Sequence, residues 1–430
     1  MQTKFMIVAA LALLVLPALS VGDASLPGPF YANGVFNPEP IAPLASDASV
    51  TASRVSFSGE PVVLVDQAGK WVWVGDFEGV HRSTNGVKWA TTKPAQAPGG
   101  FIDGFALAQD AFDGALYASS TTGQWIAVDK STDGGISWTQ VNRFASIGLP
   151  FADRPWIVTG PAPNEVTLVY NGNGGEGCMH STDGGVTFLP GSTGDVPPNA
   201  GNVARDDFGN TYYALDTTIF MWAGPNACPV HMPGQPFAAR KALPPSGAQI
   251  LTQLAVPAGT GTNANGGHVY VAVPTAGNGE MVIRATASMR TTAPDPIKTI
   301  VVSDATMKSN TFGAIAVKPD DSEIAVSWYA SNMAGDPSAS TYPATATWNV
   351  YVARITNIWS ATPTVTTQLV EAGNYHGWYC MNGVTCTSGR DLADYHGVTY
   401  GPDGKLHVVW GTETGANGSG QVEVRYANLG

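Results

Sequence analysis

The fold is decided by the sequence STDGGISW at residues 131–138, because the same pattern of residue types occurs twice more in this chain. The other two copies read STNGVKW at residues 83–89 and STDGGVTF at residues 181–188. The three copies begin 48 and 50 residues apart. A repeat of this length is typical of one propeller blade, which consists of four antiparallel strands.

Each copy has the composition of a tight turn between two strands. The Ser and Asp side chains accept hydrogen bonds from loop amides, Gly adopts a left-handed backbone conformation, and the aromatic residue packs back into the blade. The residues to which we assign this structural role are Ser83, Asn85, Trp89, Ser131, Asp133, Gly135, Trp138, Ser181, Asp183, Gly185 and Phe188.

The repeated turn resembles the Asp-box motif, Ser-x-Asp-x-Gly-x-x-Trp, of sialidases and other BNR-repeat propellers. The copy at 131–138 matches fully, whereas the third copy has Phe188 in place of Trp. The first copy has Asn85 in place of Asp and one residue fewer before Trp89. The resemblance implies a β-propeller of the sialidase-like superfamily. In that superfamily these turns lie on the outer rim, away from the catalytic face.

Apolar strands bounded by Gly-containing turns recur through the rest of the chain. The segments that we expect to be the second strand of a blade are residues 70–74, 115–118, 165–170, 211–215, 268–273, 323–328 and 405–410. We therefore predict an all-β propeller of seven four-stranded blades, or of six if one of these segments is an insertion. A two-domain α/β fold is disfavoured, because Gly and Pro interrupt every potential helix beyond the N-terminal segment.

The two ends of the chain suggest how the ring closes and where the protein resides. Residues 1–22 contain a basic start, an apolar run at 5–16 and small residues, which is the pattern of a secretory signal peptide. We expect one propeller domain over residues 23–430, located outside the cytoplasm. The last predicted strand, 422–426, leaves no room for a fourth strand, so a segment within 50–58, or the stretch just before it, should supply the fourth strand. An uncleaved signal is the alternative, and it would be the protein's only attachment to a membrane.

Net charge limits the classes of partner. The formal charge is −12, and the Lys and Arg residues are scattered singly. Because such a chain repels phosphates, we exclude nucleic acids and strongly anionic lipid surfaces as partners.

Cysteine positions and short motifs argue for disulfides and against cofactors. In an oxidising compartment we expect the four cysteines to pair as Cys380 with Cys386 and Cys178 with Cys228. Metal binding by these cysteines is the alternative, but no Cys-x-x-Cys or matching His spacing occurs. The chain has no phosphate loop, and the Asp-rich turn at 206–210 lacks the calcium-loop pattern. We assign no metal and no cofactor.

Functional side chains are expected just before the first strand of each blade, where loops surround the mouth of the central channel. There, 153–156 and 394–397 resemble segments that recur at strand starts of BNR-repeat proteins. The residues assigned to ligand binding are Asp103, Arg154, Trp378, Arg390 and His396, and those assigned to catalysis are Asp153, Asp394 and Tyr395. Guanidinium groups bind carboxylates and sulfates in bidentate fashion. The alternative is that Asp153 and Arg154 only order the rim and that Tyr395 is a core residue.

The resemblance also implies a type of reaction. Retaining sialidases use a Tyr nucleophile and hold the substrate carboxylate with three arginines, the first in an Arg-Ile-Pro segment. Arg-Ile-Pro does not occur here, while Arg154 and Arg390 supply two arginines. We interpret the chain as a secreted sialidase-like propeller that binds and hydrolyses extracellular glycans at the channel mouth. The alternative is a non-catalytic propeller that acts as a scaffold for a surface protein.

The cysteine pattern gives a first testable prediction. Peptide mass mapping without reduction should find Cys380 and Cys386 in one linked peptide. Free thiols at both positions would contradict the disulfide and remove its support for secretion.

Overall fold

The protein is described from a computed structural model that divides into two units, residues 1–34 and 35–430. All described residues belong to the second unit, and they are 35–36, 50, 52–56, 59–94, 104–122, 125–145, 152–172, 175–192, 201–215, 218–222, 228, 239–244, 246–247, 251–257, 267–289, 297–339, 341–381, 389–390, 392, 394–414 and 422–430. None of the helices in this described part is long and apolar enough to cross a membrane. The predicted signal peptide lies outside it.

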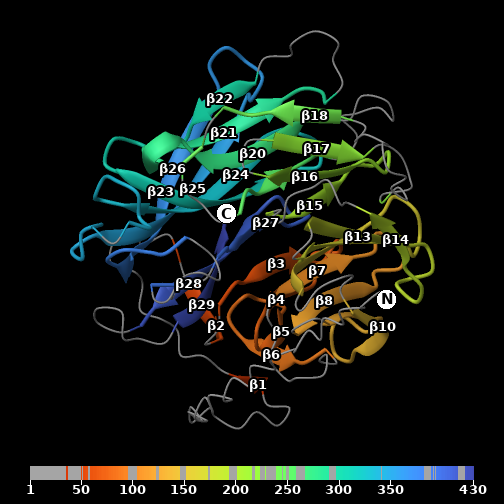
Figure 1. Cartoon of the computed structure of the whole chain (residues 1–430). Helices are drawn as coiled ribbons and strands as arrows, with labels where there is room; N and C mark the ends of the chain where they lie inside the picture. The colour runs from red at the N-terminus through yellow and green to blue at the C-terminus, as the bar shows by residue number, and fades with distance from the viewer. Residues whose placement is uncertain are drawn as a thin grey trace, which may run out of the picture. The chain divides into compact units, whose positions relative to one another are not determined.

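Antiparallel sheets follow one another along the chain as blades (Figure 1). The first blade contains β3 (Val62–Val65), β4 (Val72–Asp76), β5 (Gly79–Ser83) and β6 (Trp89–Thr92), with β1 (Val35–Phe36) added outside β6. The second contains β7 (Phe105–Gln109), β8 (Leu116–Thr122), β9 (Trp125–Ser131) and β10 (Thr139–Ala145). The third contains β11 (Ala152–Thr159), β12 (Val166–Gly172), β13 (Gly175–Ser181) and β14 (Leu189–Ser192).

The remaining blades repeat this order. The fourth contains β15 (Val203–Arg205), β16 (Thr211–Leu215), β17 (Thr218–Trp222) and β18 (Ala239–Ala242). The fifth contains β19 (Leu254–Ala255), β20 (Val269–Pro274), the 3-10 turn η1 (Ala276–Asn278), β21 (Met281–Thr286) and β22 (Lys298–Val301). The sixth contains β23 (Ser309–Val317), β24 (Glu323–Ser331), β25 (Thr347–Thr356) and β26 (Thr364–His376). The seventh contains β27 (Gly397–Tyr400), β28 (Leu406–Glu413), β29 (Val422–Leu429) and β2 (Ala52–Ser56).

The first strands form the inner wall of a ring. Each of them contacts the first strand of the next blade, in the order β3, β7, β11, β15, β19, β23, β27, and β27 returns to β3. This arrangement confirms the predicted all-β propeller with seven blades, and the six-blade alternative is wrong.

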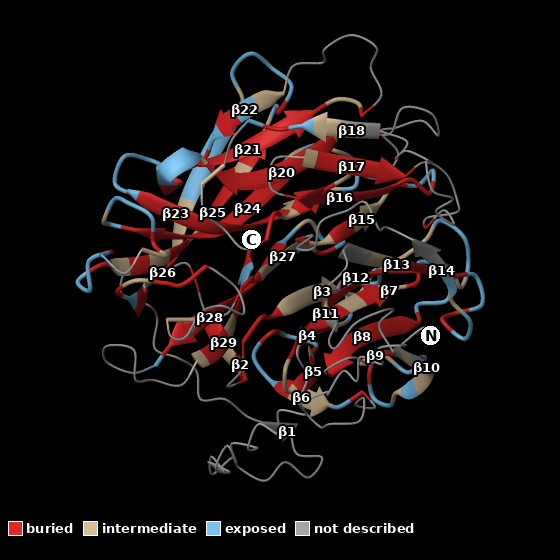
Figure 2. Cartoon of the chain, in the orientation of Figure 1, coloured by how far each residue is buried: buried red, intermediate tan, exposed pale blue. Residues whose placement is uncertain are grey.

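The second strands are the most buried part of each blade. Every residue of β8, β16, β20 and β28 is buried, and Figure 2 shows these strands in red. A second strand is covered on both faces by neighbouring blades, which is why its sequence is an almost continuous apolar run. Each of the seven predicted segments overlaps the second strand of a different blade.

The ring closes through the N-terminal segment. Strand β2 lies within the predicted range 50–58 and pairs antiparallel with β29, with Ala52 opposite Ala427. Inside this seam the Ser56 hydroxyl donates to the Asp76 carboxylate on β4, and His81 Nε2 lies 3.0 Å from Asp76 Oδ1. The closing strand is therefore bonded both to the last blade and to the first.

The repeated turns connect the third and fourth strands of blades 1 to 3. In the middle copy, Ser131 Oγ accepts from the Gly135 amide at 2.9 Å, and Asp133 Oδ1 accepts from the Ile136 and Ser137 amides at 3.0 and 2.9 Å. In the first copy Asn85 Oδ1 accepts from the amide of Val87 at 2.9 Å. Asn replaces Asp here without loss of this acceptor.

Each repeated turn is also bonded to the preceding blade. Trp73 Nε1 of blade 1 donates to the Gly134 carbonyl at 3.0 Å, and Asn142 Nδ2 of blade 2 donates to the Val186 carbonyl at 2.7 Å. For the first turn the preceding element is the closing strand, whose Ser53 Oγ donates to the Gly86 carbonyl at 2.5 Å. The repeats thus hold adjacent blades together.

One of the predicted disulfides is present between blades. Cys178 on β13 is bonded to Cys228, which follows β17, with the Cα atoms 5.6 Å apart. Cys380 is also disulfide-bonded, and its predicted partner Cys386 lies outside the described residues.

The turn geometry predicts how Asp133→Ala affects stability. The substitution removes the acceptor of two amides, but these amides are exposed and can bond water, so the free energy of unfolding should fall by only about 1 kcal/mol. Hydrogen bonds from Ser137 lower the pKa of Asp133 to about 2, so its contribution exists above pH 3.8 and disappears as the pH falls towards 2. Urea unfolding at pH 7 and pH 2.5 measures both effects.

The exposed Asp207→Ala variant is the control for Asp133→Ala. Equal stability of the two variants at pH 7 would contradict the assigned role, as would loss of ligand binding without loss of stability.

Candidate functional site

Ionisable side chains from three blades converge where the first strands begin. Glu60 precedes β3, Asp153 and Arg154 lie in the first residues of β11, and Asp394 precedes β27. Because the first strands contact one another around the ring, their starts surround one end of its centre. We call this group, together with Arg390, the mouth cluster.

Asp394 is the centre of the mouth cluster. Its side chain is 1% exposed, and its Oδ2 atom lies 2.5 Å from Nη2 of Arg154 and 2.5 Å from Nη2 of Arg390. Arg154 Nη1 also lies 3.2 Å from Asp153 Oδ2. Two arginines therefore balance two aspartates at low exposure, as buried charges require. Asp153 and Arg154 come from blade 3, and Asp394 comes from the segment that leads into blade 7.

Glu60 adds a further carboxyl group to the mouth cluster. Burial raises its pKa from 4.5 to about 8, and the negative charges of Asp394 and Asp153 act in the same direction. Arg154 and Arg390 act in the opposite direction and do not offset the rise. At neutral pH Glu60 is thus a protonated acid, which can donate a hydrogen bond or a proton.

The backbone is strained at two of these positions. Glu60 has φ of 53° and Arg154 has φ of 51°, in the left-handed region that non-glycine residues rarely adopt. Each is followed by proline, and the β11–β12 pairing shifts register between Asp153 and Trp156. Strain of this kind costs about 1–3 kcal/mol per residue and is concentrated at functional sites.

The two arginines differ in accessibility. The Arg154 side chain is 5% exposed and is held by both aspartates, whereas the Arg390 side chain is 30% exposed and, among the described residues, pairs only with Asp394. The burial and pairing of Arg154 favour the predicted alternative, in which Arg154 holds the rim of the channel mouth in place and does not bind a ligand. Arg390 is the cation of the mouth cluster that an incoming anion can reach.

Trp378 lies next to Arg390. Its ring packs on Gly389, where a Cβ atom would come within 3.1 Å of the indole, and the side chain is half-buried. The Cys380 amide donates to the Gly389 carbonyl at 2.8 Å and closes the base of the intervening loop. The Trp378 ring thus packs against the residue that precedes Arg390, and a half-buried aromatic ring of this kind can stack on a sugar.

Two tyrosines adjoin the mouth cluster. Tyr395 packs on Trp156, with ring centroids 5.0 Å apart, and its hydroxyl donates to the Phe105 carbonyl at 3.4 Å. Burial and the nearby Glu60 and Asp153 raise its pKa well above the ordinary value. Tyr395 is thus a neutral phenol in a packed environment, in line with the core alternative.

Tyr379 is the second of these tyrosines. Its hydroxyl has no hydrogen-bond partner among the described residues, and burial and the charge of Asp394 raise its pKa well above the ordinary value. In the sequence it stands beside Trp378 and Cys380, and nothing there marks it as a neighbour of Asp394.

His396 is buried and neutral. Burial lowers its pKa to about 4, and an interaction with the Ser327 backbone only partly opposes this effect. The ring packs edge-on against Tyr329 at 4.9 Å, and the His396 carbonyl accepts from Gln253 Nε2 at 3.3 Å. His396 is therefore a packed interior residue, and its 1% exposure does not fit the predicted role in ligand binding.

Other polar side chains near the ring contacts join strands and blades, and one predicted residue lies outside the described part. Asn202 Nδ2 donates to the Leu254 carbonyl and Asn202 Oδ1 accepts from the Leu254 amide, both at 2.9 Å, which links blades 4 and 5. Arg54 lies on the closing strand and pairs with Glu423 at 3.0 Å. Asp103 lies outside the described residues. The described residues contain no group of three His, Cys, Asp or Glu side chains suited to a metal ion.

Glu60 was missed by the sequence analysis, although the sequence contains a usable indication. Glu60-Pro61 precedes the first strand of blade 1 in the same way that Arg154-Pro155 opens that of blade 3. Aligning the blades on these X-Pro pairs would have selected Glu60.

Comparisons with known proteins support the fold alone. No protein-family model matches this chain, and no curated protein matches it by sequence. A copper-bound fungal alcohol oxidase of the AA5 family is similar in structure, with a TM-score of 0.51 and 11% identity over 87% of this chain and 74% of that chain. The GH74 enzyme of Niastella koreensis gives a TM-score of 0.47 and 15% identity over 86% of this chain. This chain spans about half of that enzyme, 54% of its length. The chain is thus a seven-bladed β-propeller whose structural neighbours include glycoside hydrolases and other propellers.

The raised pKa of Glu60 predicts how stability depends on pH. The unfolded carboxyl ionises near pH 4.5 and the folded one near pH 8, so the wild-type protein loses stability as the pH rises through this window. Glu60→Gln removes the dependence, and the variant should gain on the order of 3 kcal/mol relative to wild type between pH 5 and pH 9. Urea unfolding at several pH values measures this difference in stability, with the exposed Glu280→Gln as control. If the free energy of unfolding depends on pH in the same way for wild type and Glu60→Gln, the pKa of Glu60 is not raised.

Proposed function

We propose that this protein binds extracellular glycans at the mouth cluster and hydrolyses a glycosidic bond there, in the manner of a sialidase-like propeller. The observation that carries the proposal is the mouth cluster, in which Asp153 and Asp394 pair with Arg154 and Arg390 at the start of the first strands. The buried Glu60 adds a carboxyl group whose pKa burial raises to about 8. A carboxyl with a raised pKa next to ionised carboxylates is the arrangement that glycoside hydrolysis requires.

Each group has a distinct role in this proposal. Glu60 donates a proton to the leaving oxygen, since its pKa of about 8 keeps it protonated at neutral pH. Water attacks the anomeric carbon and gives its proton to Asp153, whose side chain is 17% exposed and whose negative charge also stabilises the oxocarbenium-like transition state. Arg390 binds an acidic group of the sugar, and Trp378 stacks on a sugar ring.

The proposed location is outside the cytoplasm. The Cys178–Cys228 bond and the disulfide-bonded state of Cys380 support an oxidising compartment. We propose that residues 1–22 are the secretory signal and that residues 23–430 make up the mature propeller.

The alternative function is that of a scaffold, in which the ion pairs of the mouth cluster only fill and stabilise the start of the central channel. The low exposure of Arg154 and Asp394 and their mutual pairing favour this alternative. In this alternative the protein binds a surface protein and hydrolyses nothing.

A glycan array and a panel of fluorogenic glycosides, including sialosides, test the proposal on the mature protein. Glu60→Gln should reduce hydrolysis by about 10²–10⁴-fold, because it removes the proton donor, while leaving glycan binding intact. Arg390→Ala should lower the affinity for acidic glycans by about tenfold or more and leave the affinity for neutral glycans unchanged. Arg154→Lys and Arg154→Ala should mainly reduce folding stability, because the buried Arg154 pairs with the buried Asp394 and with the partly exposed Asp153.

The scaffold function would replace the proposal if wild-type protein hydrolyses no glycoside and binds no glycan. Full hydrolysis by Glu60→Gln would remove Glu60 from the mechanism. Glu280→Gln is the matched control for expression and folding.

A further inference from the structure

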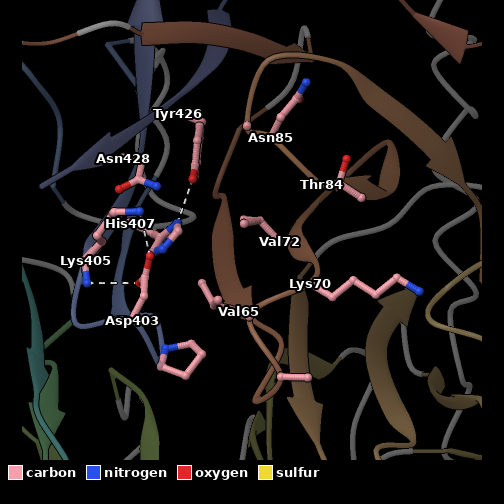
Figure 3. A pocket seen from close by; sticks show the side chains of 14 residues that line it. Val65, Lys70, Val72, Thr84, Asn85, Asp403, Lys405, His407, Tyr426 and Asn428 are labelled. Atoms are coloured by element: carbon pink, nitrogen blue, oxygen red, sulfur yellow. Dashed lines mark hydrogen bonds and ion pairs between the residues drawn. The ribbon is translucent and has the colours of Figure 1, made fainter.

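A cavity lies on the seam where blade 7 meets blade 1, at the opposite end of the strands from the mouth cluster (Figure 3). Its volume is about 580 Å³, within the range of roughly 300–1,000 Å³ that small-molecule sites occupy. One wall comes from the β3–β4 turn and the first repeated turn, and the other from β28, β29 and the turn that precedes β28. We call this cavity the seam pocket.

A buried histidine supplies a polar atom to the seam pocket. His407 is 4% exposed, and its Nδ1 atom lies 2.6 Å from the Tyr426 hydroxyl (Figure 3). Burial lowers its pKa to about 4, so the ring is neutral, and we assign the Tyr426 hydroxyl as donor to Nδ1. Nε2 then carries the hydrogen, and in the described part of the chain no protein group accepts it.

His407 and Asp403 pack closely on Gly401. A Cβ atom at Gly401 would lie 2.9 Å from His407 Nε2 and 2.9 Å from Asp403 Oδ1, so only glycine fits at this position. Both side chains line the seam pocket. A ligand hydroxyl that reaches them can accept from Nε2 and donate to the Asp403 carboxylate.

The charges around the seam pocket cancel. Asp403 Oδ2 pairs with Lys405 Nζ at 2.8 Å. Lys70 directs its ammonium group away from the pocket, 5.3 Å from the centre of the Trp71 ring (Figure 3). The interior thus favours neither an anion nor a cation.

The wall opposite His407 is apolar. Val65 and Val72 line it, and Thr84 adds a short polar side chain at its edge, while Pro402 and Asn428 lie on the same side as His407. A compact molecule with a carbon-hydrogen face and several hydroxyl groups matches this combination.

We propose that the seam pocket binds a neutral monosaccharide-sized polyol, held by His407, Asp403 and the apolar wall. The ligand bridges the first and last blades, which meet where β27 contacts β3 and where the closing strand β2 bonds to blade 1. A ligand that binds only the closed ring stabilises the folded protein by mass action, and it does so at the contact between blades 1 and 7. This inference does not depend on the chemistry of the mouth cluster.

Calorimetric titration and thermal unfolding of the mature protein with glucose, galactose, N-acetylglucosamine and glycerol test the proposal, with sodium acetate and sodium sulfate as anionic probes. At least one sugar should bind and raise the unfolding midpoint. Thr84→Trp should abolish the effect by filling the pocket edge. The matched control is Thr132→Trp, the same position in the second repeated turn, which should leave binding unchanged.

His407→Phe tests the hydrogen bond, and we expect it to weaken sugar binding by about tenfold or more. If this variant fails to fold, the result for Thr84→Trp alone decides whether the sugar binds in the seam pocket. The proposal is overturned if no sugar binds, if Thr84→Trp binds as well as wild type, or if only the anions bind. Glu60→Gln should retain the effect, which separates the seam pocket from the mouth cluster.

Discussion

The pairing of β2 with β29 is the constraint on which the rest of the structure depends. Without it, a row of seven blades leaves one face of blade 1 and one face of blade 7 uncovered, and blade 7 lacks its outer strand. Residues 52–56 remove both problems because they complete blade 7 and bond to blade 1. In the buried seam the Ser56 hydroxyl and His81 share the Asp76 carboxylate. Ring closure fixes the position of every first strand relative to the others.

The mouth cluster is a product of that closure. Glu60, Asp153 and Asp394 belong to blades 1, 3 and 7, and they meet because the first strands lie side by side around the centre. Burial there requires the charges to pair, and Arg154 and Arg390 satisfy Asp394. The left-handed backbone at Glu60 and Arg154 shows that the surrounding fold holds these residues against their preferred conformation.

The repeated turns explain why a strong sequence pattern says much about architecture and little about chemistry. They lie at the ends of the third strands, where their carbonyls accept hydrogen bonds from the preceding blade. Between later blades other contacts do this work, among them the Cys178–Cys228 bond and the Asn202 amide. Only the first turn borders the closing seam, and it therefore contributes a wall to the seam pocket.

The sequence by itself determined the repeat, the seven second strands and the closing strand, because these follow from local turn chemistry, from apolar runs and from counting strands per blade. It also selected Arg154, Arg390 and Asp394 as residues near strand starts. Only the tertiary structure decided that Asp394 pairs with both arginines and that Glu60 is buried beside them. These relations depend on distances between segments far apart in the chain, and a pKa depends on the burial that those segments create. Neither these distances nor the burial of a side chain can be derived from a local sequence pattern.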